Sequence, residues 1–286
     1  MRRASRLFAS LTFAAMMSGS ALAADLDNII NAPQEDPYVP VEVGTGWYIR
    51  GDISYDMATN TSGSYRTYGV ASAGPPVTYA YGSADYDNFD YQTGSDWSIG
   101  AGYQFNSYLR GDVTVGNWKR GVYGTDNDTT PCAAGFPTAV GCRSIDTATV
   151  TAWESMANVY ADLGTFVGVT PYLGGGLGMV NLSYSDLENV AECYDAASAA
   201  IAGCGYSATH PGESSWRFAW ALMAGASYDI SKNLKFDLGY RYSRIAGGAM
   251  FGFDAGTAAL GATGVQGSEN GFSTHQIKAG LRYAAW

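Results

Sequence analysis

Residues 234–244 read LKFDLGYRYSR, and every second position of this stretch is apolar or aromatic. Leu234, Phe236 and Leu238 would share one face of an extended chain, with Lys235 and Asp237 on the other. Because side chains alternate along a β-strand, the stretch predicts a strand with two unlike faces. A soluble sheet buries the apolar face, whereas a membrane barrel turns it to lipid and its polar face inward.

The composition favours a β protein without a nucleic-acid partner. Of 286 residues, 15% are charged and 14% aromatic, and 37 are glycine. This mixture suits strands joined by tight turns better than helical bundles. The net charge of −10 at pH 7 argues against a protein that binds a polyanion.

The N-terminus has the pattern of a secretory signal. A basic stretch at residues 1–6 precedes an apolar segment at 7–17 and a small-residue cleavage motif at 21–23. We therefore expect a signal peptide over residues 1–23 and an acidic, proline-containing periplasmic extension over 24–45. No later apolar run approaches the length of a spanning helix, so an exported chain would be either soluble or a membrane barrel.

Export also bears on the four cysteines. Cys132 lies near Cys142 in sequence, and Cys193 lies near Cys204. Three pairings are formally open, and in an oxidising compartment we favour the two local disulfides. Each would close a short loop and add about 3 kcal/mol or a little less by the chain-entropy argument.

Eight segments with strand-like alternation follow the N-terminal extension, at residues 46–57, 95–105, 108–118, 147–162, 170–184, 215–230, 234–244 and 273–286. Short turns follow the second, fourth and sixth segments. Long loops cover residues 58–92, 119–146, 185–214 and 247–271. This layout predicts an all-β fold over residues 46–286: an eight-stranded antiparallel up-and-down transmembrane β-barrel with short periplasmic turns and four long extracellular loops.

The charged strand faces then predict the content of the lumen. An eight-stranded barrel is just wide enough inside for its own side chains. We expect the lumen charges to fill it as an ion-paired network, or alternatively to set the selectivity of a narrow pore. The predicted lumen charges are Arg50, Asp52, Arg110, Asp112, Glu154, Arg217, Lys235, Asp237, Arg241, Lys278 and Arg282.

Four stretches also carry a family resemblance: GWYIRGDISY, LRGDVTVG, FDLGYRYSR and the terminal HQIKAGLRYAAW. With them, the chain resembles the outer-membrane β-barrel proteins of alphaproteobacteria, called porin-family or surface-antigen proteins, and is similar to the transmembrane domain of OmpA. The resemblance implies an integral protein of the Gram-negative outer membrane, inserted by the barrel-assembly machinery. It further implies contact with outer-membrane lipid and lipopolysaccharide, and surface-exposed loops whose ligand the sequence does not identify.

Catalytic, metal and cofactor sites are not expected. His210 and His275 are the only histidines, and although Ser273 shares a face with His275, no acid follows in triad order. The loop acids are candidate ligands for calcium or for cations that bridge lipopolysaccharide, but they match no EF-hand, and we expect solvated carboxylates. These acids are Asp85, Asp87, Asp90, Asp126 and Asp128.

The resulting functional prediction is a barrel that stabilises the envelope and interacts with the surroundings through its long loops. A narrow, low-conductance diffusion channel is the alternative. A soluble secreted β-barrel carrier is a third, less favoured reading.

Overall fold

A computed structural model describes residues 45–57, 59–127, 136 and 138–285 of the chain. The predicted signal peptide and almost all of the extension lie outside the described residues, as do Cys132 and Asp128. Within the described ranges, no helix has the length and hydrophobicity to cross a bilayer.

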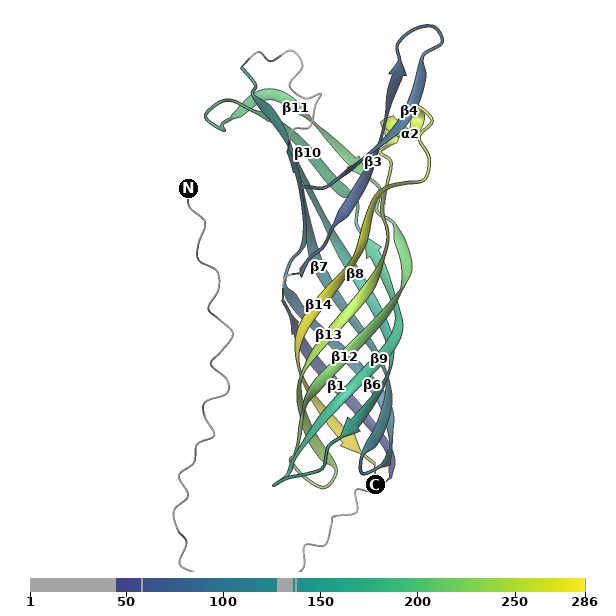
Figure 1. Ribbon diagram of the computed structural model, residues 1–286, viewed down its shortest axis with the longest axis vertical. Helices are drawn as coiled ribbons and strands as arrows, with labels where there is room; N and C mark the ends of the chain where they lie inside the picture. The colour runs from purple at the N-terminus through teal and green to yellow at the C-terminus, as the bar shows by residue number, and fades with distance from the viewer. Residues whose placement is uncertain (1–44, 58, 128–135, 137, 286) are drawn as a thin grey trace, which may run out of the picture. The chain divides into compact units, whose positions relative to one another are not determined.

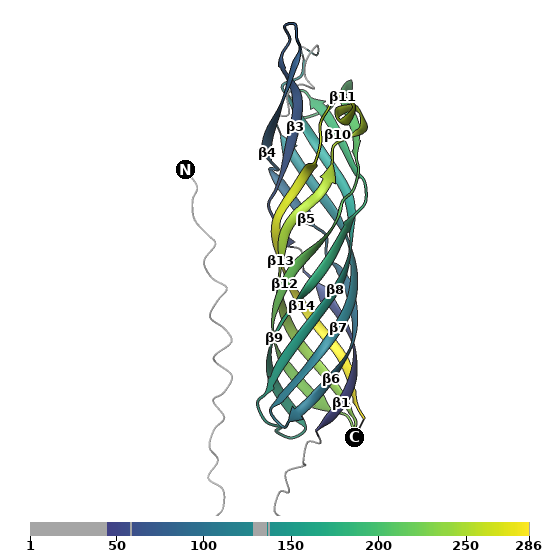
Figure 2. The same cartoon turned by 90° about the vertical axis from the view of Figure 1, so that its right-hand side faces the viewer.

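Eight long strands form a closed antiparallel ring (Figures 1 and 2). In spatial order they are β1 (Gly46–Asp56), β6 (Gly94–Asn106), β7 (Leu109–Asn127), β8 (Gly141–Asp162), β9 (Val169–Tyr184), β12 (Ser214–Asp229), β13 (Leu234–Gly252) and β14 (Val265–Ala284). β14 pairs with β1, so that Arg282 lies opposite Arg50 and the ring has no free edge there. The predicted eight-stranded barrel is confirmed.

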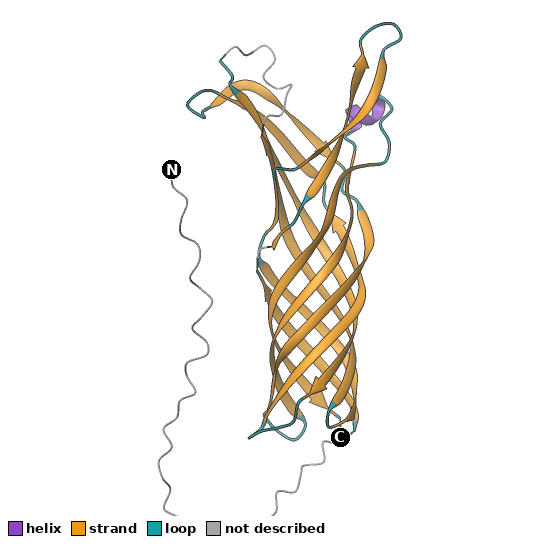
Figure 3. Cartoon of the chain, in the orientation of Figure 1, coloured by secondary structure: helices purple, strands orange, loops and turns teal. Residues whose placement is uncertain are grey.

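Short connections join β6 to β7, β8 to β9 and β12 to β13 at one end of the barrel, as predicted (Figure 3). The turn before β13 shows a local reason: Ser231 Oγ accepts a hydrogen bond of 3.1 Å from the backbone N–H of Leu234. A serine side chain that satisfies a turn amide favours reversal of the chain at this position.

The four long connections lie where predicted, but much of their sequence is strand. β7 runs to Asn127 and β8 begins at Gly141, so most of the predicted loop 119–146 extends the barrel wall. The two-residue alternation continues here, with Arg120 and Val122 inward and Tyr123 outward. A strand continues beyond the bilayer wherever a neighbour pairs its backbone groups.

The same holds at the other connections, where additional strands rise beyond the ring. β3 (Gly63–Ser72) and β4 (Thr78–Asp85) form one hairpin, and β10 (Leu187–Tyr194) and β11 (Ala200–His210) form another, which pairs with β8. Two short strands, β2 (Thr59–Asn60) and β5 (Asn88–Tyr91), pair with each other, and helix α2 (Ala255–Ala259) lies between β13 and β14.

The orientation of the two strand faces follows from side-chain exposure. Ile53 is 68% exposed on the outer surface, whereas its neighbour Asp52 is buried and Arg110 is 0% exposed. Aromatic side chains edge the apolar band, with Trp47 against Tyr103 at one end and Trp97 against Trp153 at the other. An apolar outer band between two aromatic girdles is the arrangement that a bilayer requires.

Glycines on the inner face make room for large lumen side chains. A Cβ on Gly102 would lie 2.4 Å from Cζ of the buried Tyr48 and 2.5 Å from the carbonyl oxygen of Gly111. We expect Gly102→Ala to lower the free energy of unfolding by about 1–3 kcal/mol, because the backbone atom cannot move aside. Urea titration of the refolded barrel in lipid vesicles, followed by tryptophan fluorescence, measures the effect.

Gly51→Ala is the matched control, because a Cβ at Gly51 meets nothing within 4 Å. Its unfolding midpoint should stay close to that of the wild type. Equal losses of unfolding free energy in the two variants would show that strand flexibility, not contact with Tyr48, explains the glycine at position 102.

Candidate functional site: the barrel lumen

The part of the lumen near the short turns is built around Arg50. Its guanidinium donates to Asp52 at 2.8 Å and to Asp112 at 2.7 Å, and also to the hydroxyl of Tyr160 at 3.0 Å. Asp52 additionally pairs with Lys278 at 3.1 Å. A cation and several anions from different strands therefore neutralise one another across the barrel axis.

Arg110 and Arg282 complete this part of the network. Arg110 pairs with Asp162 at 3.0 Å, and its guanidinium carbon lies 4.2 Å from the ring centre of Tyr160 and 4.9 Å from that of Tyr172. Two of the Arg110 nitrogens make no hydrogen bond within the described residues. The aromatic faces supply favourable contact to the buried cation instead.

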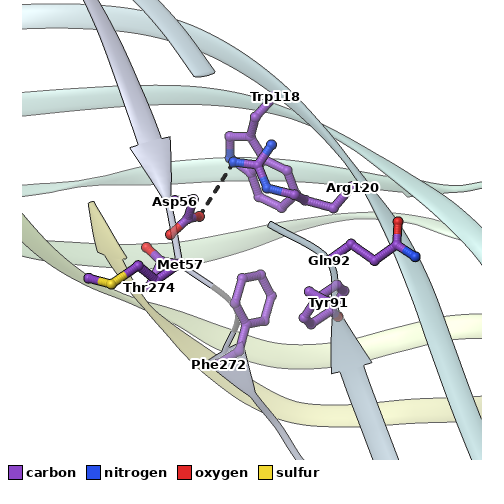
Figure 4. Close-up of a pocket in the computed structure, with 8 residues that line it drawn as sticks. All are labelled: Asp56, Met57, Tyr91, Gln92, Trp118, Arg120, Phe272 and Thr274. Atoms are coloured by element: carbon purple, nitrogen blue, oxygen red, sulfur yellow. Dashed lines mark hydrogen bonds and ion pairs between the residues drawn. The ribbon is translucent and has the colours of Figure 1, made fainter. Parts of the chain in front are cut away.

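A second polar layer lies above this one. Arg120 contacts Asp96 and Asp56, and Gln276 donates to Asp96 at 2.7 Å. Arg241 pairs with Glu154 at 2.7 Å. Figure 4 shows the ion pair between Asp56 and Arg120 beside the rings of Trp118 and Phe272.

An apolar layer then fills the lumen above these two polar layers, and the buried ion pair of Arg217 with Glu269 lies within it, with Arg217 opposite Val180 in the register of β12 and β9. Phe272 lies at its lower boundary, with ring centres 4.5 Å from Tyr91 and 6.3 Å from Trp118. Buried aliphatic side chains such as Val150, Val180 and Leu182 pack against this aromatic group. Such a layer excludes water by close packing rather than by charge.

Two cavities in the ion-paired part of the lumen are small. One of about 10 Å³ lies at the boundary drawn in Figure 4, and one of about 20 Å³ lies near Arg282 and Asp162. A single water needs roughly 10–15 Å³ by this measure. These spaces hold about one water each and no larger solute.

All eleven predicted lumen charges make an ion pair within the described residues. Glu154, Lys235 and Lys278 are half-buried, and the other eight are buried. Lys235 has its partner, Asp229, near the mouth at the short-turn end.

Sequence reasoning missed several of the partners. Asp162 and Asp96 continue the inward parity of predicted strands. Arg120 and Glu269 lie in segments predicted as loops, where following the alternation further would have found them.

The structure joins Cys193 of β10 to Cys204 of β11, with a Cα–Cα distance of 5.6 Å. This distance lies in the usual range for a disulfide. Cys142 lies opposite Cys193 in the register of β8 and β10. The predicted pairing of Cys142 with Cys132 involves a residue outside the described part of the chain and stays a prediction.

The two histidines have local partners. His275 lies against the rings of Tyr240 and Tyr242, and Ser273 Oγ lies 2.9 Å from the hydroxyl of Tyr242. His210 Nδ1 lies 3.2 Å from the carbonyl oxygen of Gly252, and burial lowers the pKa of this histidine. Among the described residues, no group of three or more His, Cys, Asp and Glu side chains gathers as a metal site.

The closed ring, the apolar outer band and the ion-paired interior define a transmembrane β-barrel. The chain belongs to the outer membrane protein beta-barrel domain family, whose model matches residues 10–284. The protein is accordingly an integral protein of the Gram-negative outer membrane.

Similar chains occur in Brucella. Uncharacterized proteins of Brucella suis biovar 1 (strain 1330) and of Brucella abortus (strain 2308) are each 34% identical to this chain over 275 residues, and each match covers 92% of this chain and 92% of the relative. The resemblance to alphaproteobacterial barrels is thereby confirmed.

Among solved structures, Neisserial surface protein A is 18% identical, with a TM-score of 0.42 over 84% of this chain and 99% of its own. The outer membrane protein OprG from Pseudomonas aeruginosa is 13% identical, with a TM-score of 0.39 over 85% of this chain and 98% of its own.

Proposed function

We propose that this protein is a closed outer-membrane barrel that stabilises the envelope and presents its long hairpins at the cell surface. The observation that carries the proposal is the filling of the lumen: two ion-paired layers are followed by an apolar layer. In this arrangement the outer surface contacts outer-membrane lipid and lipopolysaccharide, and insertion depends on the barrel-assembly machinery.

A diffusion channel is the competing function. A selective pore needs a water-lined path along which its charges face the solute. The lumen charges of this protein face one another, as in the pairs Arg50–Asp112 and Arg241–Glu154. Their pairing supports a structural role.

The hairpin formed by β3 and β4 supports a role in surface interactions. Every side chain of β4 is exposed, and the ring of Tyr68 stacks on that of Tyr79 at 5.4 Å. The guanidinium of Arg66 lies 4.1 Å from the ring centre of Tyr81. Arg66 and Tyr68 are half-buried, whereas Tyr79 and Tyr81 are exposed. Exposed aromatic rings on a projecting hairpin offer contact area to a macromolecule outside the cell.

Planar-bilayer recording tests the closed lumen. We expect the purified wild-type protein to give no steady unitary current under conditions in which a general porin conducts. Steady unitary currents whose ion selectivity changes in Arg110 or Asp237 variants would establish the channel instead. The proposal assigns no chemical step to His275. The His275→Ala variant should therefore give the same planar-bilayer recordings as the wild type.

Complementation of a deletion strain tests the two parts of the proposed role. The full chain, and a chain in which residues 67–83 are replaced by a short turn, should both restore resistance to detergents. An epitope inserted at residues 73–77 should be labelled on intact cells, whereas one inserted at 231–233 should not. Failure of both chains to restore resistance would contradict the envelope role, and the reverse labelling would contradict the orientation.

A further inference from the structure

A cavity of about 50 Å³ lies above the apolar layer, at the end of the barrel that carries the projecting hairpins. Asp126 of β7, Asp146 of β8 and Gln266 of β14 line it. The proposed function does not use this cavity.

Strand register brings the two carboxylates onto one face. Asp126 lies opposite Ser144, and Asp146 lies opposite Gly124, so the aspartates are diagonal neighbours of an antiparallel pair. Diagonal positions are close enough for two side chains to share a partner. Gly124 has no side chain, and the space that a Cβ would take is 3.5 Å from Oδ2 of Asp146.

Neither aspartate forms an ion pair within the described residues. Asp146 is only 4% exposed, and its Oδ1 accepts hydrogen bonds from Ser144 and Asn189. Asp126 accepts a hydrogen bond from the hydroxyl of Tyr65. The lumen carboxylates below are each paired with an arginine or a lysine. The buried carboxylate of Asp146 differs from them because it has no cation beside it among the described residues.

Gln266 supplies a second, independent indication. Its side chain is 8% exposed and lines the same cavity, and its Oε1 has no hydrogen-bond partner within the described residues. A buried carbonyl oxygen without a donor costs free energy unless a bound group satisfies it.

We propose that this cavity binds one divalent cation, with Ca²⁺ as the best match, through the carboxylates of Asp126 and Asp146 and the Oε1 of Gln266. Hard cations take oxygen ligands, and Ca²⁺ accepts carboxylate, amide and water oxygens in flexible geometry. A space of about 50 Å³ accommodates the ion and a water. The cation would tie β7, β8 and β14 together where the barrel wall gives way to the hairpins.

The proposal implies a pH dependence. Burial, together with the charge of Asp126, raises the pKa of Asp146 to about 6, against hydrogen bonds from Asn189 and Ser144 that lower it. The other titratable groups that face the cavity are Tyr65, Tyr86 and Tyr206, which are neutral at this pH. Because a cation and protons compete for the same carboxylates, the affinity for Ca²⁺ should fall as the pH is lowered.

Calorimetric titration of Ca²⁺ into the barrel, refolded in detergent without lipopolysaccharide at pH 7.5, tests the proposal. We expect one site per chain, at least tenfold weaker binding in Asp146→Asn and Gln266→Leu, and no change in Glu188→Gln. Glu188 is an exposed acid of β10, adjacent to Asn189 in sequence but on the opposite strand face, and serves as the matched control.

Terbium luminescence gives a second readout, because nearby tyrosines such as Tyr65 would sensitise a bound Tb³⁺ ion. Gln266→Leu keeps the test decisive if Asp146→Asn does not fold. Absence of binding to the folded wild-type barrel, or equal binding by wild type and Gln266→Leu, would overturn the cation site. Either result would leave the closed lumen and the envelope role intact.

Discussion

Replacing Arg217 with methionine is expected to lower the free energy of unfolding of the barrel by about 3–5 kcal/mol. Arg217 forms an ion pair with Glu269, and their side chains are 2% and 0% exposed. Arg217 also donates at 2.6 Å to the carbonyl oxygen of Ala249. Removal of the guanidinium leaves a buried carboxylate without its cation, which equilibrium urea unfolding in vesicles would register as a lower midpoint.

The pair Arg143–Glu192 provides a matched control outside the lumen. Its N–O distance is 3.0 Å, but the two side chains are 43% and 36% exposed. Arg143→Met should therefore cost no more than about 1 kcal/mol, because water already solvates both charges. The double variant Arg217→Met/Glu269→Gln should lose less than the sum of the single variants. Similar losses at both arginines would argue against a dry, ion-paired lumen.

Leu238→Arg is expected to destabilise the inserted barrel by about 2–4 kcal/mol, which is the cost of a cation near the bilayer midplane on the lipid face of a strand. Leu238 lies on the outer face of β13, two residues from Phe236 and from Tyr240. Unfolding in vesicles measures the loss, and the fraction of protein recovered in the outer membrane should fall with it.

Leu260→Arg separates lipid exposure from exposure to water. Leu260 is 52% exposed and Leu238 is 51% exposed, but Leu260 caps helix α2 in the connection between β13 and β14. The Leu260 variant should retain the stability of the wild type within about 0.5 kcal/mol. If both substitutions proved harmless, the outer face would not contact hydrocarbon.

Expectations from the sequence were most accurate where one strand decides the outcome. In β13, Phe236 and Leu238 face outward and Asp237 faces inward, as the alternation of LKFDLGYRYSR predicts.

The expectations from the sequence were least accurate for the part of the chain above the membrane. Residues 119–127 carry the same alternation, but the sequence predicts a loop there, and the strand continues because β8 and β5 pair with its backbone.

The proposed cation site could not be predicted from the sequence, for a different reason. Asp126 is an acidic residue that the sequence predicts to be solvated; the inward parity of Arg120 and Val122 extends to it, but no pattern in its own segment identifies the groups that it meets. Its surroundings come from Tyr65, Asp146 and Gln266, which lie on three other strands. Only the register of β7 against β8 places Asp126 diagonally across from Asp146.

The amino-acid sequence by itself divided the side chains of most membrane strands into two faces, because a two-residue period separates them without reference to any partner. The number of strands and the alternation of short turns with long connections then indicated that the apolar face meets lipid. The tertiary structure alone decided which charges meet, since Arg50 and Asp112 are 62 residues apart and Arg217 and Glu269 are 52 residues apart. It also decided that an apolar layer closes the lumen above the two polar layers around Arg50 and Arg120. Both outcomes depend on ring closure and strand register, which arise from pairing between distant segments rather than from any local pattern.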